Sequence, residues 1–456
     1  MSLKKIGVKI IDLLAAKKHQ AFFVGGFVRD TLLKRKSDNL DIATDAKPSQ
    51  VEKILKAHSI HSKPVGKKFG TILAATKAGP VEITTFRAEG NYADSRHPAK
   101  VIFVKDYRQD AKRRDFTINA MYFDPLNKKL YDPVNGSKDL RLGIIRFVGD
   151  AKKRIDEDHL RMLRAVRLAT QLGFKLEKNT FAAIKTRSKL IQDVSGERVK
   201  IEMDKILLSA SRTQGLKLLS DIGLLRFISP ELEDSKKVFH KSRYYHLEGD
   251  GLSHALLVAD ALKIHNIDLI YAALFHDVGK VSTGEYRVKP EGSVISYKGH
   301  VEVSRKIFDS FAKRLRFPAK SRKWIDRLIE LHDKKIKFYE MTEEQQVHYA
   351  LQPNFDLLLD LWNADLMGNV STKENEWYRK PRFEAYRRGL KILKQIQTRA
   401  PLTVKLAKGE LIMRYANLKP GIELGRMKDK VKAQVILGKI KNLVDLKNFL
   451  TSVTIT

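Results

Sequence analysis

The sequence predicts an α+β protein in which a head on a small mixed sheet precedes a longer, mainly α-helical region. Three observations support this prediction. Short β-rich runs alternate with loops and two helices from about residue 20 to 147, and apolar residues take helical spacing from about residue 150 onward. The chain also has 456 residues, which is too many for one ordinary core. Several domains are therefore expected.

Each element follows from a local pattern. Strands are predicted where β-branched and aromatic residues form short runs, at residues 21–24, 71–75, 81–86, 101–104 and 144–148. Helices are predicted where apolar residues recur every three or four positions, at residues 1–20, 158–172, 252–264 and 267–275. We expect four domains: a head at 1–147, a helical neck and body at 148–248, a helical domain at 249–370 and a helical tail at 371–456.

Charge and composition restrict the partners. Lysine and arginine number 87 against 53 aspartates and glutamates, a net charge of +34 that is spread along the chain and favours a polyanionic partner. No apolar run approaches the roughly 20 residues that span a membrane, so no membrane partner is expected. The absence of cysteine leaves histidine, carboxylate or water as metal ligands and fits a cytoplasmic protein.

A glycine pair lies between the first strand and the next helix. Gly25 and Gly26 stand in the run FFVGGFVRD, where backbone N–H groups and the helix dipole suit a triphosphate. Taken alone, such a pair is more often a tight turn. The following run, residues 37–45 (SDNLDIATD), supplies acidic residues on a short strand. Two-metal phosphoryl transfer requires carboxylates on one face of a strand, and Asp41 is placed for this role.

An ordered series of motifs then resembles the bacterial class II tRNA nucleotidyltransferase and poly(A) polymerase family. The series is GGFVRD at 25–30, LDIATDA at 40–46, FGT at 69–71, EITTFR at 82–87, RHP at 96–98 and RRDFTINA at 113–120. The resemblance implies a polymerase-β-like nucleotidyltransferase head that uses Mg²⁺. It also implies template-independent addition of C, C and A to the 3' end of tRNA from CTP and ATP. An A-only adding enzyme or a poly(A) polymerase carries the same motifs.

One position departs from the family pattern D-x-D-I-A-T. Alignment on the residues after Asp41 puts Asn39 where the first carboxylate is expected. A neutral amide oxygen binds magnesium more weakly than a carboxylate. Either Asp38 replaces it through a local bulge, since a one-residue slip reverses the face of a strand, or addition is impaired. In the second case the head binds RNA with weakened nucleotide addition, and the main chemistry lies elsewhere in the chain. Glu82 is either a third acid or an exposed strand glutamate.

The resemblance also assigns the nucleotide contacts. Gly25, Gly26, Arg29, Arg114, Asp115 and Asn119 are expected at the triphosphate and ribose. Asp158 and Arg161 match the E-D-x-x-R element, and their spacing predicts one helical face shared with Arg164. An aspartate acceptor beside an arginine donor can imitate the Watson-Crick edge of a base. Without the resemblance, this spacing indicates an ion pair on a solvated helix.

A second ordered set resembles the HD phosphohydrolase superfamily. It comprises His254, His276, Asp277, His300, His332 and Asp365. Imidazoles and carboxylates suit Mn²⁺, Ni²⁺ or a similar transition metal, or Mg²⁺, and ligands on separate helices can converge in a bundle. His254, His276, Asp277 and Asp365 are expected as direct metal ligands, with His300 and His332 completing a second metal position or binding phosphate. The resemblance implies phosphatase or 2',3'-cyclic phosphodiesterase activity in RNA end repair. Basic helices of the tail are expected to bind tRNA phosphates.

Overall fold

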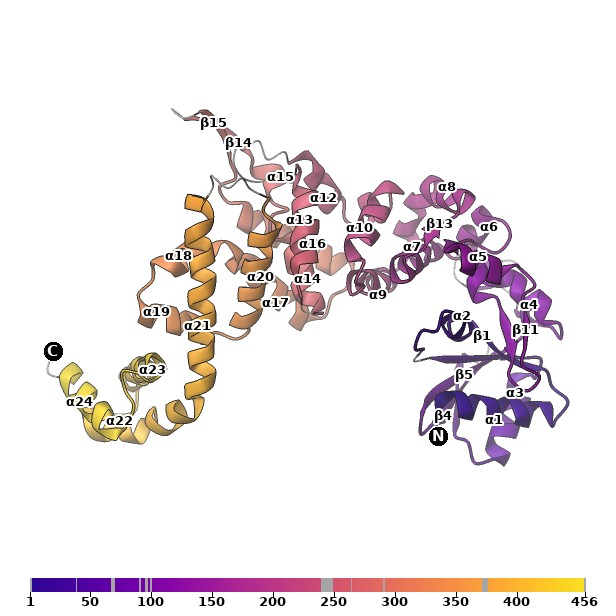
Figure 1. Cartoon of the computed structure of the whole chain (residues 1–456), viewed down its shortest axis with the longest axis horizontal. Coiled ribbons are helices and arrows are strands. Elements are labelled where there is room, and N and C mark those ends of the chain that lie inside the picture. The colour runs from indigo at the N-terminus through magenta and orange to yellow at the C-terminus, as the bar shows by residue number, and fades with distance from the viewer. Residues whose placement is uncertain are drawn as a thin grey trace. The chain divides into compact units, whose positions relative to one another are not determined.

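The computed structural model describes residues 2–37, 39–66, 70–89, 92–94, 97–98, 101–238, 249–263, 265–289, 292–370 and 376–454. Its internal contacts divide the chain into two compact units, Met1–Ile228 and Ser229–Thr456. The first is a mixed α/β unit and the second is mainly helical (Figure 1), so the α+β prediction is confirmed. None of the helices among the described residues is long and apolar enough to cross a membrane.

A seven-stranded mixed sheet forms the centre of the first unit. Its order is β11-β10-β1-β2-β5-β4-β3, and the only parallel neighbours among the paired strands described in it are β2 and β5. The strands are β1 (Ala21–Val24), β2 (Leu40–Thr44), β3 (Ser62–Gly66), β4 (Thr71–Thr76), β5 (Gly79–Thr85), β10 (Tyr122–Asp124) and β11 (Lys129–Tyr131). All four residues of β1 are apolar and buried, which suits a strand with neighbours on both edges.

The two faces of this sheet have different coverings. Helices α1 (Leu3–Ala15) and α3 (Pro48–Ala57) pack on one face, and Gly7 of α1 lies against Leu40. On the other face a cluster of buried residues includes Phe22, Phe86 and Tyr122. Because strand side chains alternate, Asp41 lies on this second face, opposite to Leu40. The sheet thus supplies both a hydrophobic core and a polar position beside it.

The rest of the first unit is mostly helical. Its helices are α2 (Gly26–Leu32), α4 (Tyr107–Arg113), η2 (Thr117–Asn119), α5 (Gly136–Leu142), α6 (Ala151–Glu157), α7 (Arg161–Leu172), α8 (Lys178–Arg187), η3 (Ser188–Asp193), α9 (Gly196–Leu207), α10 (Arg212–Asp221) and α11 (Leu225–Ile228). Short strand pairs join β6 (Arg87–Glu89) to β9 (Val101–Phe103), β7 (Tyr92–Asp94) to β8 (His97–Pro98) and β12 (Ile144–Ile145) to β13 (Lys175–Leu176).

Several predicted elements are shorter than expected, including the helix predicted at 1–20, which spans Leu3–Ala15, and the helix predicted at 252–264, which spans Gly251–Ala261. The strand predicted at 144–148 ends at Ile145, and Phe147 makes only an isolated bridge to Phe116. The helix predicted from Asp158 begins at Arg161, because Asp158 has extended dihedrals (φ −153°, ψ 105°) and lies in the turn after α6. The prediction that Asp158 shares a helical face with Arg161 and Arg164 is therefore wrong.

The second unit begins with α12 (Pro230–Asp234) and η4 (Ser235–Lys237) and contains a helical bundle. The bundle elements are α13 (Gly251–Ala261), α14 (Ile267–Phe275), α15 (Lys280–Thr283), α16 (His300–Arg314), α17 (Ala319–Leu331), η5 (His332–Lys334), α18 (Lys335–Glu340), α19 (Glu343–Ala350) and α20 (Phe355–Gly368). Helix α14, predicted at 267–275, has those bounds and is almost wholly buried. A hairpin of β14 (Glu285–Lys289) and β15 (Gly292–Ser296) connects α15 to α16 (Figure 1).

The C-terminal helices have a core of their own. They are α21 (Glu376–Leu406), α22 (Gly409–Ala416), α23 (Ile422–Leu437) and α24 (Leu443–Thr454). Leu406, Ile412, Val435 and Leu450 belong to one buried cluster. In Figure 1 the long helix α21 leads to the three shorter helices that close this cluster.

Candidate functional site

The glycine turn lies directly against Asp41. Gly25 has φ 73° and ψ −143°, a conformation that side chains rarely adopt. A Cβ atom at Gly25 would lie 3.0 Å from Oδ2 of Asp41, and one at Gly26 would lie 3.4 Å from Nη2 of Arg29. Glycine at residue 25 is therefore required both by the backbone and by the carboxylate beside it.

Asp41 has a second carboxylate as its neighbour. It is the register partner of Glu82 across the parallel pair β2 and β5, so the two side chains point to the same face. Burial raises the pKa of Asp41, against the opposing effect of Arg114. Partial desolvation by the surrounding protein and the charge of Asp41 raise the pKa of Glu82, although its side chain remains exposed to solvent. Gly25, Asp41 and Glu82 are called the head site below.

Positions 39 and 38 are the two other candidates for a metal-binding carboxylate. Asn39 is exposed, precedes β2 and accepts a hydrogen bond from Ser37 Oγ through its backbone carbonyl. Asp38 lies outside the described residues.

Two of the expected nucleotide contacts meet each other directly. Arg29 donates from Nη1 to Asn119 Oδ1 at 2.8 Å and pairs with Asp30 through Nε and Nη2. This contact joins α2 to η2 and brings the glycine turn beside the RRDFTINA segment.

Arg114 is held by a buried network. It donates to Asp110 Oδ2 from Nη2 at 3.0 Å and to the Tyr122 hydroxyl from Nε at 3.0 Å. Burial acts to raise the pKa of Asp110, but Arg113, Arg114 and the Tyr122 hydroxyl hold that pKa at about 2. The charge that restrains Arg114 thus stays ionised well below neutral pH.

Asp115 is connected to α7. Its Oδ2 accepts a short hydrogen bond from Arg164, and its Oδ1 accepts from the backbone N–H of Phe116 at 2.8 Å. Burial opposes ionisation, but Arg164 and Arg161 lower the pKa of Asp115 overall. Arg164 therefore lies beside Asp115 rather than beside Asp158.

The base-reading candidates are each held by a different partner. Asp158 accepts from Arg198 of α9 at 2.9 Å and from the backbone N–H of Leu160. Arg161 is buried and donates to Glu157 Oε2 and to the Arg154 carbonyl. Asp158 and Arg161 contact each other through the backbone, where the Arg161 N–H donates to the Asp158 carbonyl at 3.0 Å, while their side chains are held by these other partners.

Side chains from five parts of the second unit form one histidine-aspartate site. His254 lies on α13, His276 and Asp277 follow α14, His300 begins α16, His332 follows α17 and Asp365 lies on α20. His254, His276 and His332 are buried. The structure thus brings together all six residues of the second predicted set.

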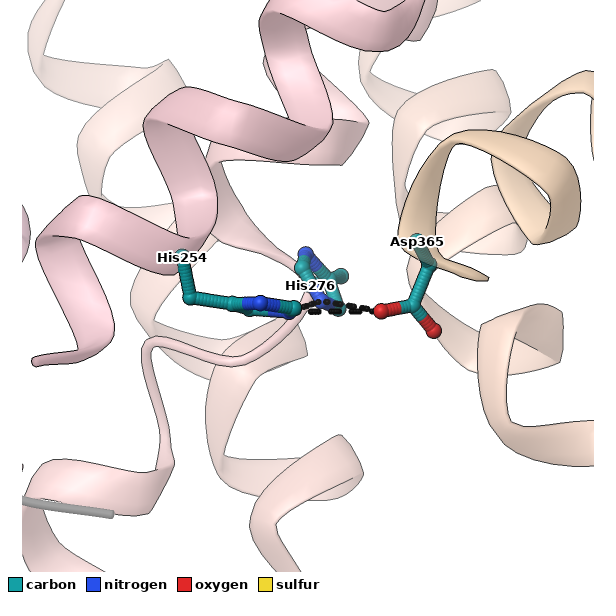
Figure 2. Close-up of side chains that lie close together, drawn as sticks. All are labelled: His254, His276 and Asp365. Carbon is teal, nitrogen blue, oxygen red and sulfur yellow. Dashed lines mark hydrogen bonds and ion pairs between the residues drawn. The ribbon is translucent and has the colours of Figure 1, made fainter. Parts of the chain in front are cut away.

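One group of ligand atoms gathers around His254. Its Nε2 lies 3.3 Å from His276 Nε2 and 3.2 Å from Asp365 Oδ1. Figure 2 shows these three side chains converging from separate helices. Asp277 Oδ2 joins this group, 3.3 Å from His276 Nε2 and 3.7 Å from His254 Nε2.

The other oxygen of Asp277 faces a second group. Asp277 Oδ1 lies 3.3 Å from His300 Nε2 and 3.5 Å from His332 Nε2. Asp277 therefore lies between two groups of imidazoles, with one oxygen toward each. This arrangement suits a carboxylate shared between two cation positions.

The imidazoles are oriented for ligation. The Nδ1 atoms of His276, His300 and His332 lie 2.7 to 2.9 Å from the backbone carbonyls of Ala273, Tyr297 and Ile329, three residues earlier in each case. This contact protonates Nδ1 and leaves Nε2 with its lone pair toward the centre of the site. The donor set therefore fits a divalent metal ion.

Sequence reasoning assigned no role to two lysines at this site. Lys280 donates to Asp277 Oδ2 at 2.6 Å, and the buried Lys335 donates to Asp365 Oδ2. Although burial acts in the opposite direction, the pKa of both aspartates lies well below the ordinary value, with His276 and Lys280 acting on Asp277 and Lys335 on Asp365. The signal for Lys335 was its position three residues after His332, which is one helical turn.

Models of known protein families match three parts of the chain. A family model described as the poly A polymerase head domain matches residues 21–146. A second, described as a probable RNA and SrmB-binding site of polymerase A, matches residues 173–236, and an HD domain matches residues 251–359.

Named relatives are similar to part of the chain. The CCA-adding enzyme of Ligilactobacillus salivarius is 42% identical over 225 residues, 49% of this chain and 54% of that protein. The Bacillus subtilis CCA-adding enzyme is 42% identical over 220 residues, 48% of this chain and 54% of that protein. The matched region thus spans about half the length of these relatives.

A solved structure is similar over nearly the whole chain. The Bacillus stearothermophilus CCA-adding enzyme, solved in complex with CTP, has a TM-score of 0.69 and 26% identity, covering 99% of this chain and 98% of that one. The chain therefore matches the models of a poly A polymerase head domain, of its RNA-binding region and of an HD domain, and it is similar over nearly its whole length to a CCA-adding enzyme.

Proposed function

We propose that this protein adds C, C and A to the 3' end of tRNA from CTP and ATP without a nucleic-acid template. The observation that carries the proposal is the position of Asp41, packed against the Gly25 turn with Glu82 beside it on the neighbouring strand. Similarity to CCA-adding enzymes, one of them solved with CTP, supports this choice of substrates.

Asp41 and Glu82 would hold Mg²⁺ in the head site. Both carboxylates have raised pKa values, so a cation between them would relieve the cost of ionising them. Bound Mg²⁺ would supply charge neutralisation at the α-phosphorus during transfer of the nucleotidyl group to the 3' end of tRNA. The 3' hydroxyl of tRNA attacks that phosphorus, the bond to the β-phosphate oxygen breaks, and pyrophosphate leaves. Asn39 can add only a neutral amide oxygen as a ligand to Mg²⁺.

The remaining head residues bind and orient the nucleotide. Backbone N–H groups at Gly25 and Gly26 face the triphosphate, with Arg29, Arg114, Asp115 and Asn119 placed around it. Asp158 accepts from the exocyclic amine of cytosine or adenine, and Arg161 donates to a ring nitrogen. Arg198 and Glu157 hold these two groups in place, while Arg164 fixes Asp115.

The test uses tRNA that lacks its last three nucleotides. With CTP alone the protein should add two residues, and with CTP and ATP it should add three and stop, as resolved on a sequencing gel. Addition of A alone or of a long A tract would identify an A-adding enzyme or a poly(A) polymerase instead. No extension in Mg²⁺, with extension restored by Asn39→Asp, would favour an RNA-binding phosphohydrolase with a weakened head.

We infer a second activity at the histidine-aspartate site. Its ligand set fits Mn²⁺, Ni²⁺ or a similar transition metal, or Mg²⁺, and such an ion would supply an activated water for hydrolysis of a phosphoester. His254, His276, Asp277 and Asp365 would hold the first ion, and His300 and His332, with Asp277, would hold a second ion or phosphate. Damaged RNA ends, bearing a phosphate or a 2',3'-cyclic phosphate, are the proposed substrates.

The hydrolytic activity is tested with purified protein and each metal. Release of phosphate, or opening of a 2',3'-cyclic nucleotide, should occur and should be lost in the double variant His276→Ala, Asp277→Ala. Unchanged turnover in that variant would remove the assignment.

The functional divisions follow from these sites. We place the nucleotidyltransferase head at 1–147, the neck and body at 148–248, the phosphohydrolase domain at 249–370 and a tRNA-binding tail at 371–456. The family matches at 21–146, 173–236 and 251–359 support these limits. The net charge of +34 supports tRNA as the partner, and the absence of cysteine supports a cytoplasmic location.

A further inference from the structure

The histidine-aspartate site carries equal numbers of carboxylates and ammonium groups. Lys280 Nζ lies 2.6 Å from Asp277 Oδ2, and Lys335 Nζ pairs with Asp365 Oδ2. Metal ligation requires neutral imidazoles, and with these the two aspartates and two lysines give the site a net charge of zero. A cation that entered would therefore meet ligands whose negative charge is already balanced.

Both lysines are fixed parts of the site. Lys335 has 4% of its surface exposed and is the first residue of α18, three residues after His332. The side chain of Lys280 is 12% exposed, and its ammonium lies 5.5 Å from the centre of the Tyr297 ring. A buried ammonium that left its carboxylate would lose much of its stabilisation. Lys280 and Lys335 are therefore expected to stay paired, and to keep their positive charges in the site, when a metal ion binds. Asp333, the middle residue of η5, is exposed, and its charge is screened by solvent.

The lysines also restrict how the aspartates can coordinate. Lys335 engages Oδ2 of Asp365, while Oδ1 faces His254 at 3.2 Å. Asp365 can thus offer one oxygen to a metal ion without breaking its ion pair. The charge of Lys335 and its contact with Asp365 Oδ2 both weaken binding of a metal ion that enters without an accompanying anion.

We propose that this site binds its divalent ion together with a doubly charged phosphate monoester, so that each ligand strengthens binding of the other. The inference rests on the proposed phosphohydrolase function and specifies its substrate. A divalent ion adds two positive charges to a neutral site, which a monoester with two negative charges cancels and a phosphodiester with one does not. The preferred substrate is therefore an RNA end with a terminal phosphate, rather than a cyclic phosphodiester.

The test measures Mn²⁺ binding by the full chain, from the electron paramagnetic resonance signal of free Mn²⁺, at about pH 8, where a monoester carries two charges. Methyl phosphate should lower the Mn²⁺ dissociation constant by roughly tenfold, a usual strength of coupling between two ligands. Dimethyl phosphate, with one charge, should change it by less than about twofold.

Two lysine variants test the origin of the coupling. Lys335→Met should bind Mn²⁺ more tightly than wild type when no phosphate is added, and methyl phosphate should then improve binding by less than about threefold. Lys280→Met, at a less buried lysine, should behave in the same way if Lys335→Met does not fold, as judged by circular dichroism. Lys334→Met, at the exposed neighbour, should match wild type.

The outcomes separate this inference from the function on which it rests. Equal effects of methyl and dimethyl phosphate, or full coupling in the lysine variants, would overturn the inference while leaving a metal site. If His276→Ala bound Mn²⁺ as wild type does in every buffer, the phosphohydrolase proposal itself would fail.

Discussion

The head site and the histidine-aspartate site use opposite means of holding carboxylates together. In the head, Asp41 and Glu82 are neighbours with raised pKa values, and neither has an ion pair among the described residues. In the second unit, Asp277 and Asp365 each pair with a lysine and have strongly lowered pKa values. The head thus leaves its negative charge to an incoming cation, whereas the second site balances its own.

The largest effect should come from removing the uncompensated charge of the head. Asp41→Asn should slow nucleotide addition to tRNA by about a thousandfold or more, because the head would lose a carboxylate that holds the Mg²⁺ stabilising the charge that develops on the phosphate. Phosphoester hydrolysis should be unaffected. Single-turnover incorporation of labelled CTP measures the effect, with Asp12→Asn, at an exposed position of α1, as the control for loss of one charge. Addition that survives in Asp41→Asn would place the chemistry elsewhere.

The reverse experiment addresses the second site. His276→Ala should weaken Mn²⁺ binding by more than about 100-fold, since loss of a direct ligand exceeds the usual effect of losing its supporting hydrogen bond. Nucleotide addition should remain at the wild-type rate. Isothermal titration calorimetry measures the affinity, and His265→Ala, at an exposed histidine outside the site, is the control. A parallel loss of nucleotide addition would mean that the two sites are not separable.

Asp110 tests whether the head, like the histidine-aspartate site, also contains a carboxylate whose charge is balanced by ion pairs. Folding lowers the pKa of Asp110 from 3.8 to about 2. At pH values above 3.8, this shift corresponds to about 2 kcal/mol of stability. Asp110→Asn should therefore lower the stability of the head by about 2 kcal/mol at neutral pH. Because a depressed pKa stabilises only where the unfolded carboxyl is ionised, the difference should shrink as pH falls from about 4 toward 2.

The head must be observed by hydrogen exchange in its own strands. All three tryptophans, Trp324, Trp362 and Trp377, follow residue 228, so their fluorescence reports on the second unit and provides the internal control. Faster exchange of β1 and β10 with unchanged tryptophan unfolding is the expected result. If the stability difference between wild type and Asp110→Asn grew as pH fell, the claim that folding lowers the pKa of Asp110 would be wrong.

The smallest effect concerns the contact between the turn and Asp41. Gly25→Ala should reduce nucleotide addition by roughly tenfold, because its Cβ would press on Asp41 Oδ2 and its backbone would be strained by about 1–3 kcal/mol. Gly149→Ala is a matched control: φ is +69° there, but no atom lies within 4 Å of an added Cβ. If both variants lost addition equally, backbone strain alone would explain the result and the contact with Asp41 would be irrelevant.

Much of this arrangement was predictable from local pattern. Strand β1 and helix α14 have the predicted bounds, because a short apolar run and a run with helical spacing each specify one structure. The ordered histidines and aspartates named the second site, since imidazoles and carboxylates are the main metal ligands left in a chain without cysteine. The head motifs named Gly25 and Asp41 in the same way.

The rest depended on contacts that sequence spacing does not contain. Asp158 was expected on a helix, but its extended backbone puts it in a turn where Arg198 holds it. Glu82 becomes the neighbour of Asp41 through the parallel register of two strands, although the two residues are 41 positions apart in sequence. Lys335 meets Asp365 across 30 residues, and only the packing of α18 and α20 around the site brings them together.

Nucleotide addition by the head with Asn39 in place is the central claim, and Glu82 provides its most direct test. The rate of CMP incorporation in Mg²⁺ should be measured for wild type, Glu82→Gln and Asn39→Asp. Wild type should extend the truncated tRNA, Glu82→Gln should lose most of that rate, and Asn39→Asp should increase it. A wild type that extends nothing, or a Glu82→Gln variant as fast as wild type, would contradict the claim that Asp41 and Glu82 together hold the magnesium.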